Sequence, residues 1–419
     1  MCDKSLRKMQ LLPHNLNFNI AIFLSGTQFL QSDKFVVRAL FYIWSIFWSA
    51  NALDGTILFI SNLTEENYFE LTEVFAFFVA NTAASLGTIL FGRYQLKWYY
   101  LYQTLMSCKR FGKTPQFDKI LTLGNQLGKL AVVSLVCGLL SYTTMILLDE
   151  RRCDKVEIAI YVPYLQKKRF QHYNGRKVCG VLGPTWWPPN LEPTLVYKRL
   201  LLIYQMLALG YSSCTLFVAF MIYHCTEFIG DRAVHLSELF QKICSISSSQ
   251  EQFQSFRNWL DYHEDILELC GKLNKLTKRS LGHVTLIVAA TIGSLGYQVV
   301  KDRSPKCLPY ILAYLSLISL MCLCGQKLED QVIAQILPGS INGDSPLKQI
   351  MNIRHSVYLS KWYNCDMKVR KLLPLVLLRG QRKAVLDALP IGNVNFMLLL
   401  TVLKTTYSYI TLLQQTIYK

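Results

Sequence analysis

The sequence predicts an all-α, polytopic membrane protein with seven transmembrane helices and a cytoplasmic N-terminus. Of its 419 residues, 52% are hydrophobic and only 17% are charged, whereas a soluble protein carries about 25% charged residues. Mostly apolar runs of roughly 20 residues, the length that crosses a bilayer, recur along the chain. Lys and Arg concentrate in alternate connections between these runs, as they do in the cytoplasmic loops of membrane proteins.

Composition and motifs also exclude several classes of function. A net charge of +17 would suggest a nucleic-acid partner in a soluble protein, but here it follows from the cytoplasmic loops, so we expect membrane lipid and no nucleic acid. The thirteen cysteines form no Cys-x-x-Cys pair, and His263-Glu264 lacks the second histidine of a zinc-protease helix, so we expect no metal and no cofactor. No phosphate-binding loop, nucleophile elbow or paired-carboxylate site occurs, and we therefore do not expect an enzyme.

Residues 1–35 are expected to be a cytoplasmic N-terminus with an interfacial helix. Basic residues precede an apolar run over residues 18–30, which is the charge order of a signal peptide. Polar residues interrupt that run, and no small-x-small cleavage site follows it. We therefore favour an uncleaved helix lying at the membrane interface over a cleaved signal peptide.

Residues 36–325 are predicted to hold spans one to six. The excess of Lys and Arg in the second, fourth and sixth connections places the N-terminus inside. The sequon Asn62-Leu63-Thr64 then lies outside, so Asn62 is a candidate glycosylation site, unless the triplet arose by chance. The expected spans are 36–60, 71–91, 127–148, 196–223, 281–299 and 308–324.

The third connection, residues 149–193, is predicted to be a long outer loop. Cys153 and Cys179 both fall within it, in an oxidising compartment, so either a disulfide or two separate thiols is possible. Trp186 and Trp187, among several prolines, are expected to cover the outer helix ends near the level of the lipid headgroups.

Two cytoplasmic connections are predicted to be partly helical. Between His224 and Arg279, apolar residues recur near helical spacing among charged ones, so we expect helices that continue the neighbouring spans. Residues 326–392 form a basic and apolar segment that could bind the membrane surface or pack against another subunit. Pro390 and Gly392 should break the chain before span seven, which is expected over residues 393–419.

Span seven carries a polar stripe. Five of its residues are spaced four, three, four and three apart, which places them on one helical face. Such a stripe indicates either hydrogen bonding to a partner helix or the lining of a water-filled pore. The stripe comprises Thr401, Thr405, Ser408, Leu412 and Gln415.

Motifs in the second half of the chain resemble those of insect odorant receptors. The sister gustatory receptor family is the alternative, but the end of this chain departs on both sides from that family's Thr-Tyr, five residues, Gln-Phe pattern. The segments that resemble odorant receptors are Val402-Leu403-Lys404 with residues 407–413, Leu377-Leu378-Arg379-Gly380-Gln381-Arg382-Lys383, and Trp186-Trp187-Pro188-Pro189 with Tyr204-Gln205.

The resemblance implies the insect odorant receptor fold and a ligand-gated, non-selective cation channel of four subunits. It implies that span seven lines the pore, that Leu412 is the hydrophobic gate, and that residues 326–392 are a cytoplasmic anchor between subunits. The chain lacks the long insertion that the olfactory coreceptor carries after span four. It therefore resembles an odorant-tuned subunit that joins the coreceptor in a heterotetramer, in the plasma membrane of olfactory sensory neurons.

The family places its odorant pocket in the outer half of the bundle, where aromatic rings and methionines would bind small volatile molecules. Packing in the core or against lipid is the alternative for each residue named below. Lys404 is unexpected beside a cation path and could reach the inner interface or a wide, wet vestibule. The pocket candidates are Phe75, Phe78, Tyr142, Met145, Tyr204, Met206, Tyr310 and Tyr314.

Two other classes fit less well. A G-protein-coupled receptor has its N-terminus outside, and the sequence lacks that class's Asp-Arg-Tyr and Asn-Pro-x-x-Tyr motifs. Transporter folds usually contain internal repeats with broken helices, and no repeat is found in this sequence.

Overall fold

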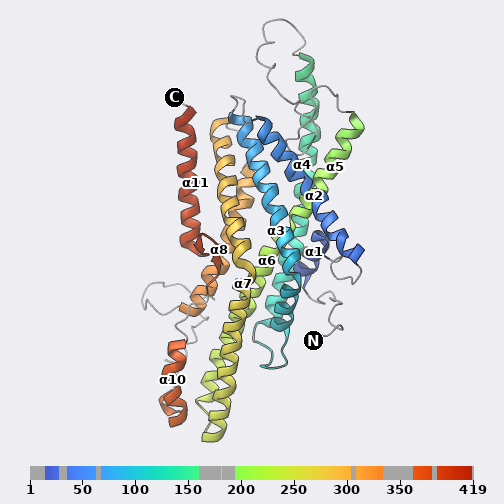
Figure 1. The fold of residues 1–419 in the computed structure, drawn as a ribbon. Helices are drawn as coiled ribbons and strands as arrows, with labels where there is room; N and C mark the ends of the chain where they lie inside the picture. Colours follow the sequence, from blue (N-terminus) through green and yellow to red (C-terminus); the bar gives the residue numbers. More distant parts are fainter. Residues whose placement is uncertain are drawn as a thin grey trace.

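A computed structural model describes residues 15–27, 35–62, 68–159, 181, 194–302, 308–333, 362–379 and 385–417. Over these ranges the chain is an elongated bundle of helices with one small hairpin (Figure 1). The elements are α1 (Leu16–Ser25), α2 (Phe35–Asn62), α3 (Tyr68–Met106), α4 (Phe117–Ala159), α5 (Leu195–Ser212), α6 (Cys214–Ile243), α7 (Ser249–Asp302), α8 (Leu308–Ile333), the 3-10 turn η5 (Trp362–Asn364), α10 (Met367–Arg379), β1 (Asp387–Ala388), β2 (Gly392–Asn393) and α11 (Phe396–Ile417).

The expected spans fall on these helices, and the helix ends differ from the expected span limits in three places. The expected fourth span, 196–223, is two helices, α5 and α6, which meet at Ser213, whose hydroxyl donates to the Gly210 carbonyl at 2.6 Å. The expected outer loop 149–193 begins as helix, because α4 continues to Ala159. The last helix begins at Phe396 rather than at residue 393, because residues 392 and 393 pair in the hairpin.

Four stretches of the described residues are long and apolar enough to cross a membrane: Phe117–Ser141, Leu195–Ile243, Ser249–Tyr297 and Ile311–Glu329. These overlap the expected spans three to six. The first and seventh expected spans overlap shorter apolar stretches, Ala39–Ala50 and Phe396–Leu412. The membrane boundaries therefore stay a prediction.

The core lies where α6 packs against α3, α7 and α8. Residues 224–279 are helical apart from the turn between α6 and α7, as their apolar spacing predicts. Phe256 and Trp259 of α7 stack on each other, and Phe240 of α6 packs at an angle against both rings. The Trp259 indole donates to the Leu236 carbonyl at 2.7 Å. Burial of these rings stabilises the long α6–α7 hairpin.

Helix α1 packs inside the bundle, against α6, α4 and α3, with Phe18 and Ala21 fully buried. Asn15 caps its start by accepting from the Phe18 N–H at 3.1 Å. Gly26, at φ +67°, ends it, so the helix is shorter than the predicted run to residue 30. Its position relative to a membrane stays a prediction.

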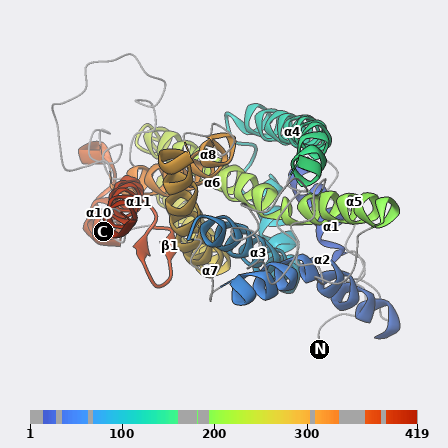
Figure 2. The same cartoon turned by 90° about the horizontal axis from the view of Figure 1, so that it is seen from above.

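The two ends of the bundle differ. Helix α10 and the turn between α6 and α7 lie at the lower end in Figure 1, and the described end of α11 lies at the upper end. Seen from above, α11 stands at the edge of the bundle beside α7 and α8, with α2, α4 and α5 on the far side (Figure 2). One side of α11 is therefore uncovered.

Candidate functional site: the last helix and the hairpin at its base

Helix α11 has three distinct faces. The packed face carries Leu398, Val402 and Thr406, which are buried against the bundle. A second face is apolar and exposed, and it carries Leu400 and Leu403. An exposed apolar face on a helix at the edge of the bundle is typical of contact with lipid.

The third face is the predicted polar stripe, and all of its residues are exposed. Since successive residues turn by about 100° around a helix, Thr401 lies a quarter-turn from Val402 on the packed face. Leu412, toward the end of the stripe, is 57% exposed. Lys404 is also exposed and lies at the edge of the stripe, between Leu400 and Ser408 around the helix.

Two stripe hydroxyls donate to carbonyls of their own helix, which leaves their oxygen lone pairs for other partners. Thr401 donates to the Met397 carbonyl at 2.8 Å, and Thr405 donates to the Thr401 carbonyl at 2.9 Å. A hydroxyl has one hydrogen to donate, so these bonds leave only acceptor capacity on the exposed side. Such a surface suits water molecules and cations better than anions.

Glycines allow α11 to approach the bundle closely. A Cβ on Gly293 would lie 2.7 Å from the Tyr409 ring, and one on Gly296 would lie 2.6 Å from the end of Ile410. A Cβ on Gly325 of α8 would overlap the Val394 carbonyl oxygen, which precedes α11. Small residues at such contacts let helix backbones pack tightly.

A short hairpin fixes the base of α11 to α7. Strands β1 and β2 pair Asp387 with Asn393 and Ala388 with Gly392. The Leu389 N–H donates to the Lys278 carbonyl of α7 at 3.0 Å. Sequence reasoning read Pro390 and Gly392 only as a helix break, although a proline and glycine between short runs are also a turn signal.

Two buried or half-buried charged pairs were missed by sequence reasoning. Lys327 of α8 contacts the Glu227 carboxylate of α6 at 2.5 and 2.6 Å. Arg232 of α6 contacts Asp265 of α7 at 3.1 Å. The partners of the first pair lie 100 residues apart in sequence, so only the fold brings them together.

Arg232 also caps the C-terminal end of α3. Its guanidinium donates to the carbonyls of Thr104 at 2.7 Å, Leu105 at 3.0 Å and Ser107 at 3.3 Å. The last carbonyls of a helix have no partner within the helix, and a cation there also stabilises the negative end of the helix dipole.

The described pocket candidates lie on three helices, α3, α5 and α8. Tyr204 of α5 packs in a small cluster with Trp48, and its hydroxyl donates to the Phe47 carbonyl at 2.7 Å. Met206 accepts from the Thr143 hydroxyl at 3.5 Å. The polar groups of these two side chains therefore support the packing of α5 against α2 and α4.

The other candidates lie on α3 and α8 or have side chains outside the described residues. Tyr314 of α8 packs against the main core, and Phe75 and Phe78 are half-buried on α3. The side chains of Tyr142, Met145 and Tyr310 lie outside the described residues.

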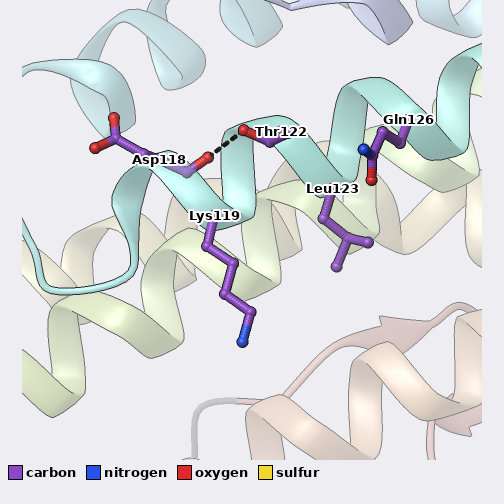
Figure 3. A pocket seen from close by; sticks show the side chains of 5 residues that line it. All are labelled: Asp118, Lys119, Thr122, Leu123 and Gln126. Atoms are coloured by element: carbon purple, nitrogen blue, oxygen red, sulfur yellow. Dashed lines mark hydrogen bonds between the residues drawn. The ribbon is translucent and has the colours of Figure 1, made fainter.

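One hollow lies on the outer face of α4 (Figure 3). Its five lining side chains all come from that one helix, and all are exposed, so it is an open surface feature rather than an enclosed ligand cavity. None of the predicted pocket residues lines it. The lining residues are Asp118, Lys119, Thr122, Leu123 and Gln126.

Three further predicted sites lie outside the described side chains. Asn62 is the last residue of α2, but its side chain and the rest of its sequon are not described. Cys153 lies in α4 without a described side chain, and Cys179, Trp186 and Trp187 fall in an undescribed segment. Glycosylation and the disulfide therefore stay predictions.

Comparison with known proteins decides the family. The family model described as "7tm Odorant receptor" matches residues 70–334 and 331–407, which together are more than half of the chain. The chain belongs to the 7tm odorant receptor family. Family members are receptors, so this odorant receptor family protein is not an enzyme.

Individual relatives are distant. Odorant receptor Or2 of Anopheles gambiae is 24% identical over 208 residues, which are 49% of this chain and 50% of that protein. Odorant receptor 67c of Drosophila melanogaster is 20% identical over 174 residues, 41% of this chain and 39% of that protein. The matched stretch thus spans half or less of the length of these relatives.

A solved structure shares the fold over nearly the whole chain. The insect olfactory receptor OR5 from Machilis hrabei, in complex with eugenol, matches with a TM-score of 0.70 at 14% identity, covering 96% of this chain and 97% of that one. A second structure of the same receptor matches with a TM-score of 0.66. The predicted insect odorant receptor fold is therefore confirmed.

Proposed function

We propose that this chain is the odorant-tuned subunit of a ligand-gated, non-selective cation channel, and that it assembles with the insect olfactory coreceptor as a heterotetramer. The exposed polar stripe of α11 is the observation that carries this proposal. The site of action would be the plasma membrane of olfactory sensory neurons, with the N-terminus in the cytoplasm.

A polar stripe on a helix at the edge of the bundle is best explained by a pore. One helix is only about 10–12 Å across, so several copies must surround an axis to enclose water. With four subunits, each would contribute one α11. Leu412 would form the hydrophobic constriction, and Gln415 a polar ring just outside it.

The chemistry of the stripe favours weak selection for cations. The outward acceptors of Thr401 and Thr405 replace part of an ion's hydration. Residues 393–419 contain no Asp or Glu, so no acidic ring adds strong selectivity. Lys404, at the edge of the stripe, would face a wide, wet inner vestibule, where water screens its charge.

Odorants would bind in the outer half of the bundle through apolar burial and dispersion. Phe75 and Phe78 on α3 and Tyr314 on α8 are half-buried and supply aromatic surface for a small volatile ligand. Tyr204 and Met206 would act as the wall behind such a site, because their polar groups already bond to neighbouring helices. Eugenol, with which OR5 forms its complex, is a small aromatic molecule of this kind.

The decisive experiment expresses the chain with and without the coreceptor and records current against a panel of volatile odorants. We expect cation current only with the coreceptor and also in excised patches, where soluble messengers are lost. Odorant responses that vanish in excised patches would contradict the channel proposal. Equal current without the coreceptor would contradict the tuned-subunit proposal and favour a gustatory-like channel.

A matched pair of variants tests the pore face. Leu412→Ala removes the constriction and should leak without odorant, whereas Leu400→Ala, on the apolar face of the same helix, should stay closed. Gln415→Ala should change the relative permeability to Na⁺ and K⁺. A leak from Leu400→Ala but not from Leu412→Ala would assign the pore to a different face.

A further inference from the structure

Two cysteines that are 121 residues apart in sequence meet at the predicted cytoplasmic end of the bundle. Cys244 follows the last residue of α6, and Cys365 lies between η5 and α10. Their Sγ atoms are 3.2 Å apart, closer than an ordinary van der Waals contact between two sulfurs. Neither cysteine takes part in the fold contacts of α11 described above.

One buried glutamine holds both cysteine segments in place. Gln252, 3% exposed on α7, donates from its side-chain amide to the carbonyl of Ile243, directly before Cys244, at 3.1 Å. Its side-chain oxygen accepts from the N–H of Asp366, directly after Cys365, at 2.7 Å. The two sulfurs are therefore positioned by the surrounding backbone rather than by chance contact of mobile side chains.

We propose that Cys244 and Cys365 are an oxidative modification site, at which a peroxide converts the two thiols to a disulfide that ties α6 to the segment before α10. A disulfide bond is about 2.05 Å long, so the sulfurs need to approach by only about 1 Å. In the proposed orientation the pair lies on the cytosolic side of the membrane. Because the cytosol is reducing, the two thiols are reduced at rest. The inference rests on the proposed topology for that resting state.

The chemistry proceeds in two balanced steps. Hydrogen peroxide first oxidises the half-buried Cys244 thiol to a sulfenic acid and releases one water molecule. The Cys365 sulfur then attacks the Cys244 sulfur, the S–S bond forms, and the sulfenic oxygen leaves as a second water molecule with the Cys365 proton. Overall, two thiols and one peroxide give one disulfide and two waters.

Burial sets the order and the speed of these steps. Cys365 is buried, and loss of solvation raises the pKa of its thiol above the ordinary value. The thiolate is the nucleophile, so Cys365 is protected from direct attack by oxidant and acts only as the slow, resolving partner. The site therefore responds to sustained peroxide rather than to a brief exposure.

The bond would restrain the base of the bundle. It would enclose α7 and α8 in one covalent loop and fix α10 relative to the end of α6. If opening moves α10 relative to α6, oxidation should lower the odorant-evoked current, and a reductant should restore it.

The test uses the full-length receptor in cell membranes. Membranes are treated with hydrogen peroxide, remaining thiols are blocked with N-ethylmaleimide, and the digested protein is analysed by mass spectrometry. We expect a dithiothreitol-sensitive peptide that links Cys244 to Cys365. Cys365→Ser and Cys244→Ser should abolish it, while Cys108→Ser, in the α3–α4 connection, should leave it intact.

Oxidation of Cys244 to sulfinic acid in the wild-type receptor without the linked peptide would overturn the proposal. This measurement needs no variant, so a poorly folding Cys365→Ser protein does not weaken it. It also needs no current. A receptor that forms the linked peptide but does not conduct contradicts the proposed channel function alone.

Discussion

Asn274 and Asp387 exchange two hydrogen bonds across the base of the last helix. The Asn274 side-chain amide donates to the Asp387 carboxylate at 2.7 Å, and the Asp387 backbone N–H donates to the Asn274 side-chain oxygen at 2.9 Å. Asn274 belongs to the long helix α7, and Asp387 begins the hairpin that leads into α11. These two bonds tie the hairpin before α11 to α7.

A charge swap tests this link. Asn274→Asp should place two carboxylates in contact and destabilise the folded receptor by about 1–3 kcal/mol, because a half-buried acceptor loses its donor. Adding Asp387→Asn supplies a side-chain N–H again and should restore most of the stability. Thermal unfolding of the receptor in detergent measures both variants.

The control for this swap is Lys275→Ala, which alters an exposed residue next to Asn274. We expect its melting temperature to match the wild type within experimental scatter. Additive losses in the double variant, with no recovery, would show that the two side chains are not coupled.

Gly325→Ala should disturb the entry into α11. The new methyl group would overlap the Val394 carbonyl, so the chain before the helix must shift, and we expect lower surface expression and odorant current. Gly271→Ala is the matched control, since nothing lies near a Cβ there, and alanine favours helix by about 0.5–1 kcal/mol. Equal damage from both substitutions would exclude the close contact as the cause.

Substitutions of two neighbouring threonines distinguish a pore-lining face from a packed face. Thr405→Val removes an exposed acceptor on the stripe and should lower single-channel cation conductance by about twofold. Thr406→Val makes the same chemical change on the packed face, where the residue is 7% exposed, and should leave conductance unchanged. Conductance that responds only to Thr406→Val would refute the proposed pore face.

Arg232→Met should destabilise the bundle by about 3–5 kcal/mol, because it leaves Asp265 and the end of α3 without their cation. Arg110→Met removes a side chain whose pairing with Asp261 is exposed and 3.9 Å long, and should cost less than about 1 kcal/mol. Denaturation of both variants in the same detergent checks the difference. Similar losses would mean that burial of Arg232 contributes little.

Local patterns predicted much of the fold. Apolar period and length located the helices, and the spacing of Thr401, Thr405 and Leu412 correctly placed them on one exposed face. The spacing of apolar residues also predicted that residues 224–279 are mostly helical. Each of these features depends on residues close together in sequence.

A helix break and the contacts between residues far apart in sequence could not be predicted. The apolar spacing is the same on both sides of the break at Ser213. Hydropathy alone therefore predicts a single span where the structure has two helices. The pairs Glu227–Lys327 and Asn274–Asp387 join residues at least 100 positions apart, and one sequence holds no signal that couples them. The pocket candidates rest on residue type and on position in the outer halves of the predicted spans. Neither distinguishes a ligand contact from Tyr204, whose hydroxyl donates to a carbonyl of α2.

The separation between the packed and polar faces of α11 has an evolutionary consequence. Leu398 and Val402 hold the helix to the bundle, while the side chains of the stripe are exposed. In the proposed pore, substitutions along the stripe would therefore alter ion passage at little cost in folding. In a ring shared with a coreceptor, natural variation in one receptor gene would retune conduction gradually, because its helix supplies only part of the wall.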